Sequence, residues 1–332
     1  MDSSELWAIL SHALAAVAQK HRGDPAYYSG YQYSVWHVLK VLLWCTVRDV
    51  APWVLYERLA EDPSFRRKHG LPTQIISLSQ YKKRLKTPHV RRALLHFLQW
   101  SGARALRLLG HQEVRIVAMD LTRLESSRRR DMKAAWGWDS RGGFWGYKLG
   151  LICSQQGVLL GLTLMKANFT EYQVNTRLIR MASETIQTAF GAMPVDYLVC
   201  DAGFDGERTY QAAHQHLHAP AVCPPKRRRS SKVKRAREIL HRAQLRTPFR
   251  YRDHQLWEAP ETTDVYRKRT VIEQVNGQLK EAPFRIDEIP PRQRGVHRLL
   301  LRCLAKAIHF NLAIIANVSS GRKTRQIRGR AA

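Results

Sequence analysis

Two short apolar runs that each lead into an aspartate constrain the fold of this chain more than any other feature. EVRIVAMD ends at Asp120, and VDYLVC runs directly into Asp201. Both runs contain β-branched residues and have the length of a strand, so each is predicted to be a buried strand. In sheets of α/β proteins, ligands bind at the carboxyl ends of the strands. A lone aspartate at a strand end is more often a turn or capping residue, so neither acid identifies a site without a partner.

The segments around these strands complete an order of elements. The predicted elements are a polar, basic loop at 126–143, a hairpin at 144–168 that turns at 155–157, a helix at 170–190, a helix at 205–217 capped by Asp205, and a strand at 219–225. Strand, hairpin, helix, strand, helix, strand and a later helix is the order of an RNase H-like fold. The predicted class is therefore α/β, a mixed sheet flanked by helices.

The first 110 residues differ from this core, because their apolar positions recur at helical spacing. Within them Ser77–Lys86 is predicted to be a short capped helix with Tyr81 exposed, followed by three cations, Lys82, Lys83 and Arg84. Such a helix after a Gly-Leu-Pro turn could read DNA ends, as a helix-turn-helix does. The alternative is an ordinary solvated helix face. We expect an all-α N-terminal DNA-binding region at 1–110.

The charge of the chain points to a polyanionic partner. It carries 55 Lys and Arg against 27 Asp and Glu, a formal net charge of +28. Such a surface suits nucleic acid, although a ribosomal or histone-like protein has the same composition. Eleven Lys or Arg fall within residues 226–250, and Arg227, Arg228 and Arg229 are predicted to contact the DNA backbone.

The cysteines, the N-terminus and the apolar stretches favour a reducing, aqueous compartment. Its five cysteines are scattered and form no C-x-x-C pair, which argues against a disulfide framework or a zinc ribbon. The N-terminus has no basic region before its apolar part, so it is not expected to be a signal peptide. The apolar stretches at 35–48 and 299–318 are interrupted by charged residues or His and fall short of a clean membrane span. A soluble protein is expected.

A helix at 265–283 supplies the third acid. With about 100° of rotation per residue, Arg269, Glu273 and Lys280 lie within about 60° of Tyr266 on one stripe. The opposite side is apolar and forms a packing face. A generic amphipathic helix does not require a Tyr, an Arg and a Lys to align with a single Glu.

The spacing Y-x2-R-x3-E-x6-K resembles the YREK signature of bacterial insertion-sequence transposases of the DDE class. VAMDLT around Asp120 and YLVCDAGFDG around Asp201 are similar to the segments that carry the first two acids of that class. The resemblance covers about residues 113–315 and is loose in the N-terminal third.

The resemblance implies a catalytic triad of Asp120, Asp201 and Glu273 that holds two divalent ions, Mg²⁺ or Mn²⁺. Oxygen ligands suit these hard ions, and two metals suit phosphodiester chemistry. Asp120 would bridge both ions, while Asp201 and Glu273 would each hold one. Arg269 and Lys280 would clamp phosphates. Tyr266 would either bond a phosphate or pack in the core. Four other acids lack such a partner pattern, namely Glu125, Asp131, Asp139 and Asp205.

The resemblance also implies a reaction and partners. The protein would bind terminal inverted repeats in double-stranded DNA, cleave the element ends and transfer the strands to target DNA, as a homodimer in the bacterial cytoplasm near the nucleoid. The expected divisions are a helical DNA-binding region at 1–110, a catalytic domain at 111–290 with a basic insertion at 224–262, and a C-terminal helix and basic tail at 291–332. A non-catalytic repressor and an RNase H-like nuclease remain alternatives. Trp257 could hold a flipped base, but a packed aromatic is the favoured interpretation.

Overall fold

A computed structural model provides the structure of the chain. It describes residues 3–22, 34–62, 64–68, 76–127, 131–139, 141–170, 173–224, 246–257, 259–289 and 294–324. The strands are β1 (Ile116–Glu125), β2 (Ala135–Asp139), β3 (Gly142–Ser154), β4 (Leu159–Lys166), β5 (Tyr197–Cys200) and β6 (Ala221–Val222). They form one sheet in the order β2-β3-β1-β5-β6, and β4 also pairs with β3. The pairs made by β3 are antiparallel, whereas β1–β5 and β5–β6 are parallel, so the sheet is mixed.

The predicted hairpin is confirmed. β3 and β4 pair antiparallel, and Gly157 in the turn between them has a φ of 85°, a value that favours glycine. The predicted loop at 126–143, by contrast, contains strand β2, which pairs with the start of β3. Its sequence AWGWD alternates small or acidic residues with Trp136 and Trp138, and both tryptophans are exposed. The pattern therefore lacked the apolar inner face by which a strand is recognised.

Helices cover both faces of the sheet. On one face α8 (Asn175–Phe190) lies so close that a Cβ on Gly150 would approach Leu178 to 2.9 Å. Leu121 faces Gly150 across the β1–β3 ladder and lies on this same side. Asp120 immediately precedes Leu121 in β1 and therefore points to the other face. There α13 (Thr270–Lys280) packs against β1 and β3. The two faces thus carry different helices, and Asp120 lies on the side of α13.

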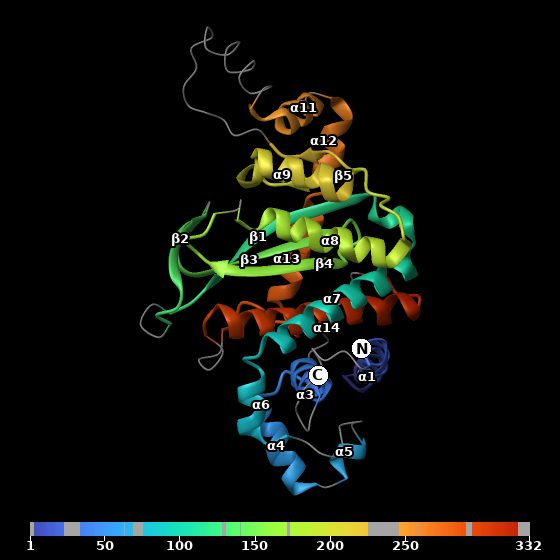
Figure 1. Cartoon of the computed structure of the whole chain (residues 1–332), viewed down its shortest axis with the longest axis vertical. Helices are drawn as coiled ribbons and strands as arrows, with labels where there is room; N and C mark the ends of the chain where they lie inside the picture. The colour runs from blue at the N-terminus through green and yellow to red at the C-terminus, as the bar shows by residue number, and fades with distance from the viewer. Residues whose placement is uncertain are drawn as a thin grey trace.

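A long buried helix joins this layer to the N-terminal helices. α14 (Val296–Ser319) packs against β4, against α7 (Pro88–Leu109), and against α1 (Ser3–Lys20) and α3 (Val35–Val47). In Figure 1, α7 lies between α8 and α14, and α1 and α3 lie beyond α14. Lys306 of α14 is 1% exposed, and its ammonium group reaches Asp49 at 2.8 Å. The remaining helices of the N-terminal part are α4 (Pro52–Glu61), α5 (Phe65–Lys68) and α6 (Leu78–Arg84).

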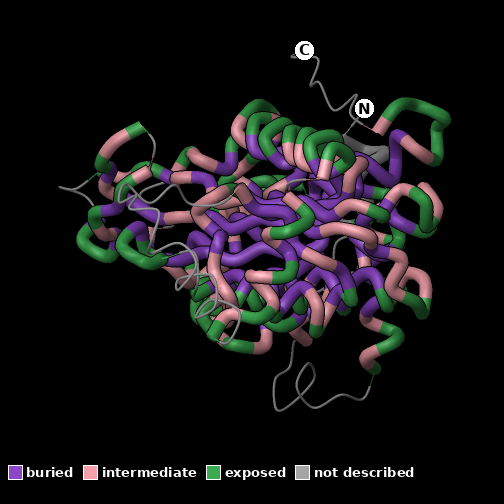
Figure 2. Tube along the Cα trace, turned by 90° about the horizontal axis from the view of Figure 1, so that it is seen from above, coloured by how far each residue is buried: buried purple, intermediate pink, exposed green. Residues whose placement is uncertain are grey.

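The core is continuous through these layers. Figure 2 shows the buried residues gathered in the middle of the molecule beneath exposed outer turns. Helix α14 is long and apolar enough to cross a membrane. This finding differs from the expectation that residues 299–318 are too interrupted to form a membrane span. In this structure 94% of its apolar window is buried, which is how the central helix of a folded core behaves. The five cysteines all lie among the described residues, are buried and form no disulfide bond.

Candidate active site

Asp120 and Asp201 occupy neighbouring positions on adjacent strands. The parallel ladder between β1 and β5 ends at the pair Met119 and Cys200, so the two aspartates come next in register. The expectation that β1 ends at Asp120 is wrong. Pairing with β3 continues from Asp120 to Glu125, which places Asp120 in the middle of its strand. Asp201 does follow the end of β5, where its carboxylate accepts a hydrogen bond from the Ala202 amide at 2.5 Å.

The predicted single helix at 265–283 is two helices. α12 (Pro260–Arg267) ends before α13 begins at Thr270. Lys268 and Arg269 keep right-handed helical backbone angles, but the hydrogen bonds across the junction span three residues rather than four. This tighter step changes the rotation between the two helices. The angles calculated from Tyr266 for one continuous helix therefore do not apply, although Tyr266 still contacts Arg269, and Arg269, Glu273 and Lys280 keep their relation within α13.

Arg269 lies between the acids and Tyr266. Its guanidinium group forms an ion pair with Glu273 at 2.5 Å and lies 5.7 Å from the centre of the Tyr266 ring. The charges of Tyr266, Glu273, Asp120 and Asp201 all act to raise the pKa of Arg269 against the effect of burial. Lys280, two turns after Glu273, is also within electrostatic reach of Asp120. Arg269 is therefore within electrostatic reach of all three carboxylates, and Lys280 of Asp120 alone among them.

The Asp120 carboxylate is shielded from water and lies near other negative charges. The pKa of Asp120 is raised to about 6; burial is the largest cause, and the charges of Asp201 and Glu273 act in the same direction. The Leu121 amide and Arg269 act in the opposite direction. Carboxylates that share a site repel one another, and a bound cation relieves that repulsion. The electrostatics of the three acids therefore favour a positively charged ligand.

Asn276 is a site residue that the sequence did not reveal. It lies on α13 about one turn after Glu273. Its side-chain amide donates a hydrogen bond of 2.9 Å to Asp120 Oδ2. Only 8% of Asn276 is exposed, and its Oδ1 is buried without a hydrogen-bond partner. An asparagine in V-N-G-Q gives no signal of such a role, because its partner is 156 residues away in sequence.

The donors at this site fit a hard divalent cation. Three carboxylates, with the unpartnered Oδ1 of Asn276 next to them, offer oxygen ligands only, which is the preference of Mg²⁺ and Mn²⁺. Within the described residues, however, no three His, Cys, Asp or Glu side chains are gathered closely enough to hold one ion. Glu273 is engaged with Arg269 instead. A cation that recruited Glu273 would have to displace this ion pair.

Each of the four other acids considered from the sequence has a partner of its own. Glu125 and Asp139 pair with Arg123, at 2.9 Å and 3.5 Å, and Asp131 bonds Tyr147 Oη at 2.9 Å. Asp205 is not the helix cap that was predicted, because Gly206 occupies that position. These contacts are with residues other than Arg269, whereas Glu273 pairs with Arg269 and the charges of Asp120 and Asp201 act on it.

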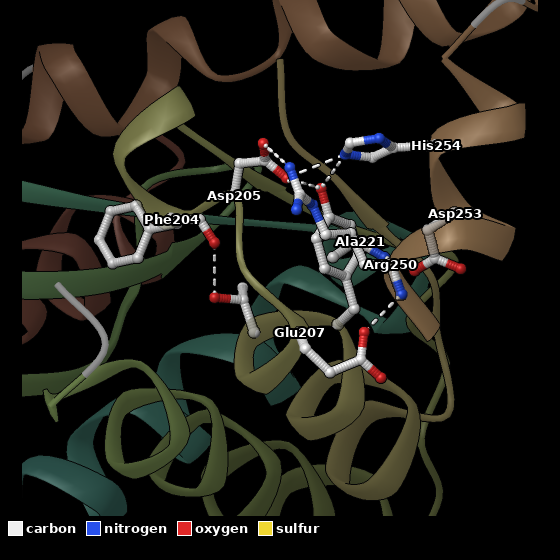
Figure 3. A network of polar contacts seen from close by, with 9 residues as sticks. Phe204, Asp205, Glu207, Ala221, Arg250, Asp253 and His254 are labelled. Carbon is white, nitrogen blue, oxygen red and sulfur yellow. Dashed lines mark hydrogen bonds and ion pairs between the residues drawn. The ribbon is translucent and has the colours of Figure 1, made fainter. Parts of the chain in front are cut away.

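Asp205 instead lies at the centre of a buried polar network (Figure 3). Its fully buried carboxylate receives two hydrogen bonds from Arg250, at 2.8 and 2.7 Å, and a third contact from His254 at 2.9 Å. Glu207 accepts from the Arg250 backbone amide at 2.9 Å. Arg250 and His254 belong to α11 (Pro248–Leu256). The network therefore fixes α11 against the turn that follows Asp201.

The remaining predicted contacts have mixed outcomes. Lys82 and Lys83 are exposed and Arg84 is half-buried on the capped helix α6, in which Ser77 accepts from the Gln80 amide. The prediction that Tyr81 is exposed is wrong. Tyr81 is 1% exposed, because it packs near Tyr56. The predicted DNA contacts Arg227, Arg228 and Arg229 lie outside the described residues.

Two further side chains near the site are packed. Trp257 is half-buried and meets the Tyr266 ring edge-on, with 5.1 Å between ring centres. This contact agrees with the favoured interpretation of Trp257 as a packed aromatic. His214 contacts the buried carboxylate of Asp253 at 2.8 Å. The contacts of Trp257 and His214 described above are with Tyr266 and Asp253, not with Asp120, Asp201 or Glu273.

Comparison with known proteins adds one finding. The sequence model of the family described as "Transposase DDE domain" matches residues 111–308. The match begins just before β1 and ends inside α14, so it includes every strand and all three acids. No curated protein and no solved structure matched the chain.

Proposed function

Because the chain belongs to the transposase DDE-domain family, we propose that it is the transposase of a bacterial insertion sequence. Family membership implies DNA as the partner and divalent metal ions as cofactors. The proposed reaction is cleavage of DNA at the element ends, recognised through terminal inverted repeats, followed by transfer of the strands to target DNA. The mixed sheet flanked by helices is consistent with an RNase H-like catalytic domain.

One observation carries the proposal: Asp120 and Asp201 occupy adjacent register positions, with Arg269 and Glu273 beside them. Asp120, Asp201 and Glu273 would hold the metal, Mg²⁺ or Mn²⁺, and Asn276 would fix the orientation of the Asp120 carboxylate. When bound, the metal would neutralise phosphate charge and lower the pKa of water. Arg269 and Lys280 would bind phosphate oxygens, Arg269 through two parallel hydrogen bonds. Tyr266 would support Arg269 through the ring contact.

Each proposed division of the chain has a role in this reaction. Residues 1–110 would recognise the element ends, with Lys82, Lys83 and Arg84 at the DNA. Residues 111–290 would cut, with the basic insertion at 224–262 and its Arg227, Arg228 and Arg229 along the DNA backbone. Residues 291–332 would complete the fold. Two ends cut in concert would require at least a homodimer on DNA, and the protein would act in the cytoplasm at the nucleoid.

The test is the substitution Glu273→Gln, which keeps the shape of the side chain and removes its charge. We expect this variant to bind end DNA like the unaltered protein but to lose Mg²⁺-dependent cleavage by a factor of about 10²–10³, as for other groups needed in the transition state. Glu125→Gln is the matched control, because Glu125 is an exposed acid of the same type on β1. Normal cleavage by Glu273→Gln would refute the assignment of the third acid. Binding without any cleavage by the unaltered protein would favour a repressor, and cleavage without strand transfer would favour a nuclease.

A further inference from the structure

Helices α7 and α8 enclose a groove on the face of the sheet away from the three acids. The groove is open to solvent, and the space in it, together with the solvent at its mouth, amounts to about 640 Å³. Arg92 and Gln99 of α7 line one side, and Arg177 and Arg180 of α8 line the other. Arg91 lies next to Arg92 and within electrostatic reach of Arg177. We call this feature, with its four arginines at 91, 92, 177 and 180, the arginine groove.

The positive charge of the arginine groove is largely uncompensated. Glu184 is the one carboxylate that lines it, and it pairs with Arg180 at 3.7 Å. Among the described residues, no carboxylate lies within 4.0 Å of Arg91, Arg92 or Arg177. Partial burial and the charges of Arg91 and Arg180 lower the pKa of Arg177. Like charges crowded in this way repel one another, and an anion placed among them relieves the repulsion.

The walls of the groove are held together by contacts between the two helices. Arg107 of α7 donates to the carbonyl oxygens of Thr188 and Ala189 at the end of α8, the second at 3.0 Å. Gln99 bonds Thr188 at 3.2 Å. Beneath them Thr185 donates to the Leu160 carbonyl of β4 at 3.0 Å. The arginines therefore project from a fixed frame rather than from a loop.

The arginine groove and the acids lie on opposite faces of the sheet. α8 packs over Gly150, on the side to which Leu121 points, whereas Asp120 points toward α13 and Asn276. One straight DNA segment that reaches the acids cannot also lie between α7 and α8 on the other face. Guanidinium groups bind phosphates through two parallel hydrogen bonds, and several in a row suit a phosphodiester backbone.

We propose that the arginine groove binds the phosphate backbone of a second DNA segment, distinct from the segment that is cut at the three acids. The proposal needs DNA as the partner but not the assignment of Asp120, Asp201 and Glu273. The contacts are to phosphates, so they supply affinity and position without sequence preference. Each phosphate neutralised there releases bound cations, which makes the interaction sensitive to salt.

The test compares two double variants of the full chain. Arg92→Glu with Arg177→Glu reverses two charges of the groove, and Arg92→Gln with Arg177→Gln only removes them. If the charge reversal harms folding, the glutamine variant still tests the proposal. Arg104→Glu is the control, because Arg104 is exposed on α7 but does not line the groove. Duplex binding is measured by fluorescence anisotropy over a range of KCl concentrations. The number of duplexes bound per chain is measured by analytical ultracentrifugation.

For both double variants we expect the slope of log K against log[KCl] to fall by about 1.8, about 0.9 for each lost phosphate contact. We also expect the second duplex to be lost while the first is still cut. A slope and stoichiometry equal to those of Arg104→Glu would overturn the proposal. So would an unchanged stoichiometry together with loss of self-association, which would assign the groove to contact between copies of the chain. Glu273→Gln should leave the second duplex bound, which separates this proposal from that of the active site.

Discussion

Asn276 donates a hydrogen bond of 2.9 Å from its side-chain amide to Asp120 Oδ2, and so ties helix α13 to the middle of strand β1. Glu273 lies on the same helix about one turn earlier. One helix therefore presents an acid to the site and also orients the acid of the neighbouring strand. This contact therefore helps to hold the helix acid and the strand acid in their relative positions.

The first prediction concerns that contact. Asn276→Ala removes the donor and frees the Asp120 carboxylate to rotate, so metal-dependent cleavage should fall about 10- to 100-fold, as for other residues that orient metal ligands. The concentration of Mn²⁺ needed for half-maximal cleavage should rise, and duplex affinity should not change. Titration with Mn²⁺ beside a DNA-binding assay checks both. An unchanged Mn²⁺ requirement would show that Asn276 does not position Asp120.

A second prediction concerns the ion pair between Arg269 and Glu273. Arg269→Ala releases Glu273 and removes a positive charge, so Mn²⁺ should bind the DNA-free protein about 2- to 5-fold more tightly, which corresponds to the ~0.5–1 kcal/mol of a partly exposed pair. Duplex affinity should fall, because a phosphate contact is lost. Electron paramagnetic resonance of free Mn²⁺ measures the first effect. Arg267→Ala, which breaks the exposed pair with Asp264, is the matched control and should change neither quantity.

A third prediction concerns the network at Asp205. Arg250→Ala leaves a fully buried carboxylate with fewer donors, and removing one partner of such a pair costs about 3 kcal/mol. The free energy of unfolding in urea should fall by that amount, and hydrogen exchange of α11 should accelerate. Arg180→Ala breaks an exposed pair with Glu184 and should change stability by less than about 0.5 kcal/mol. Equal effects of the two substitutions would contradict the structural role of Arg250.

The fourth prediction is a loss of stability in acid that depends on His309. Burial, and then the charge of Lys306, lowers the pKa of His309 to about 3 in the folded protein, against an ordinary value of 6.5. Between pH 6.5 and about 3, His309 is therefore protonated in the unfolded chain but neutral in the folded protein. Stability should be full above pH 6.5 and should fall as the pH drops toward 3, by up to about 1.4 kcal/mol per pH unit from this group.

Urea unfolding of His309→Leu between pH 7 and pH 4 checks that sign. The variant should lose less stability than the unaltered protein over this range, because it has no buried imidazole to keep neutral. His12→Leu is the control, since His12 is exposed on α1. A parallel pH dependence in His309→Leu and the unaltered protein would exclude His309 as the cause.

The strands that carry acids could be predicted because their signals are local. Short apolar runs that contain β-branched residues mark β1 and β5, and Gly157 marks the hairpin turn. Where the sequence misled, the deciding contact was distant. β1 runs on past Asp120 because β3 continues to pair with it, and Asp205 is buried by an arginine 45 residues later. No glycine or proline marks the step at Lys268 and Arg269, so periodicity could not separate α12 from α13.

The position of α14 also bears on how the protein is made. This helix is synthesised after the sheet and after α1, α3 and α7, yet it packs against all of them. Multidomain chains commonly complete their earlier parts first during translation. Here the apolar surfaces of both the N-terminal helices and β4 remain uncovered until α14 has left the ribosome. A chain whose translation terminates before residue 296 would therefore be released with both of these apolar surfaces uncovered.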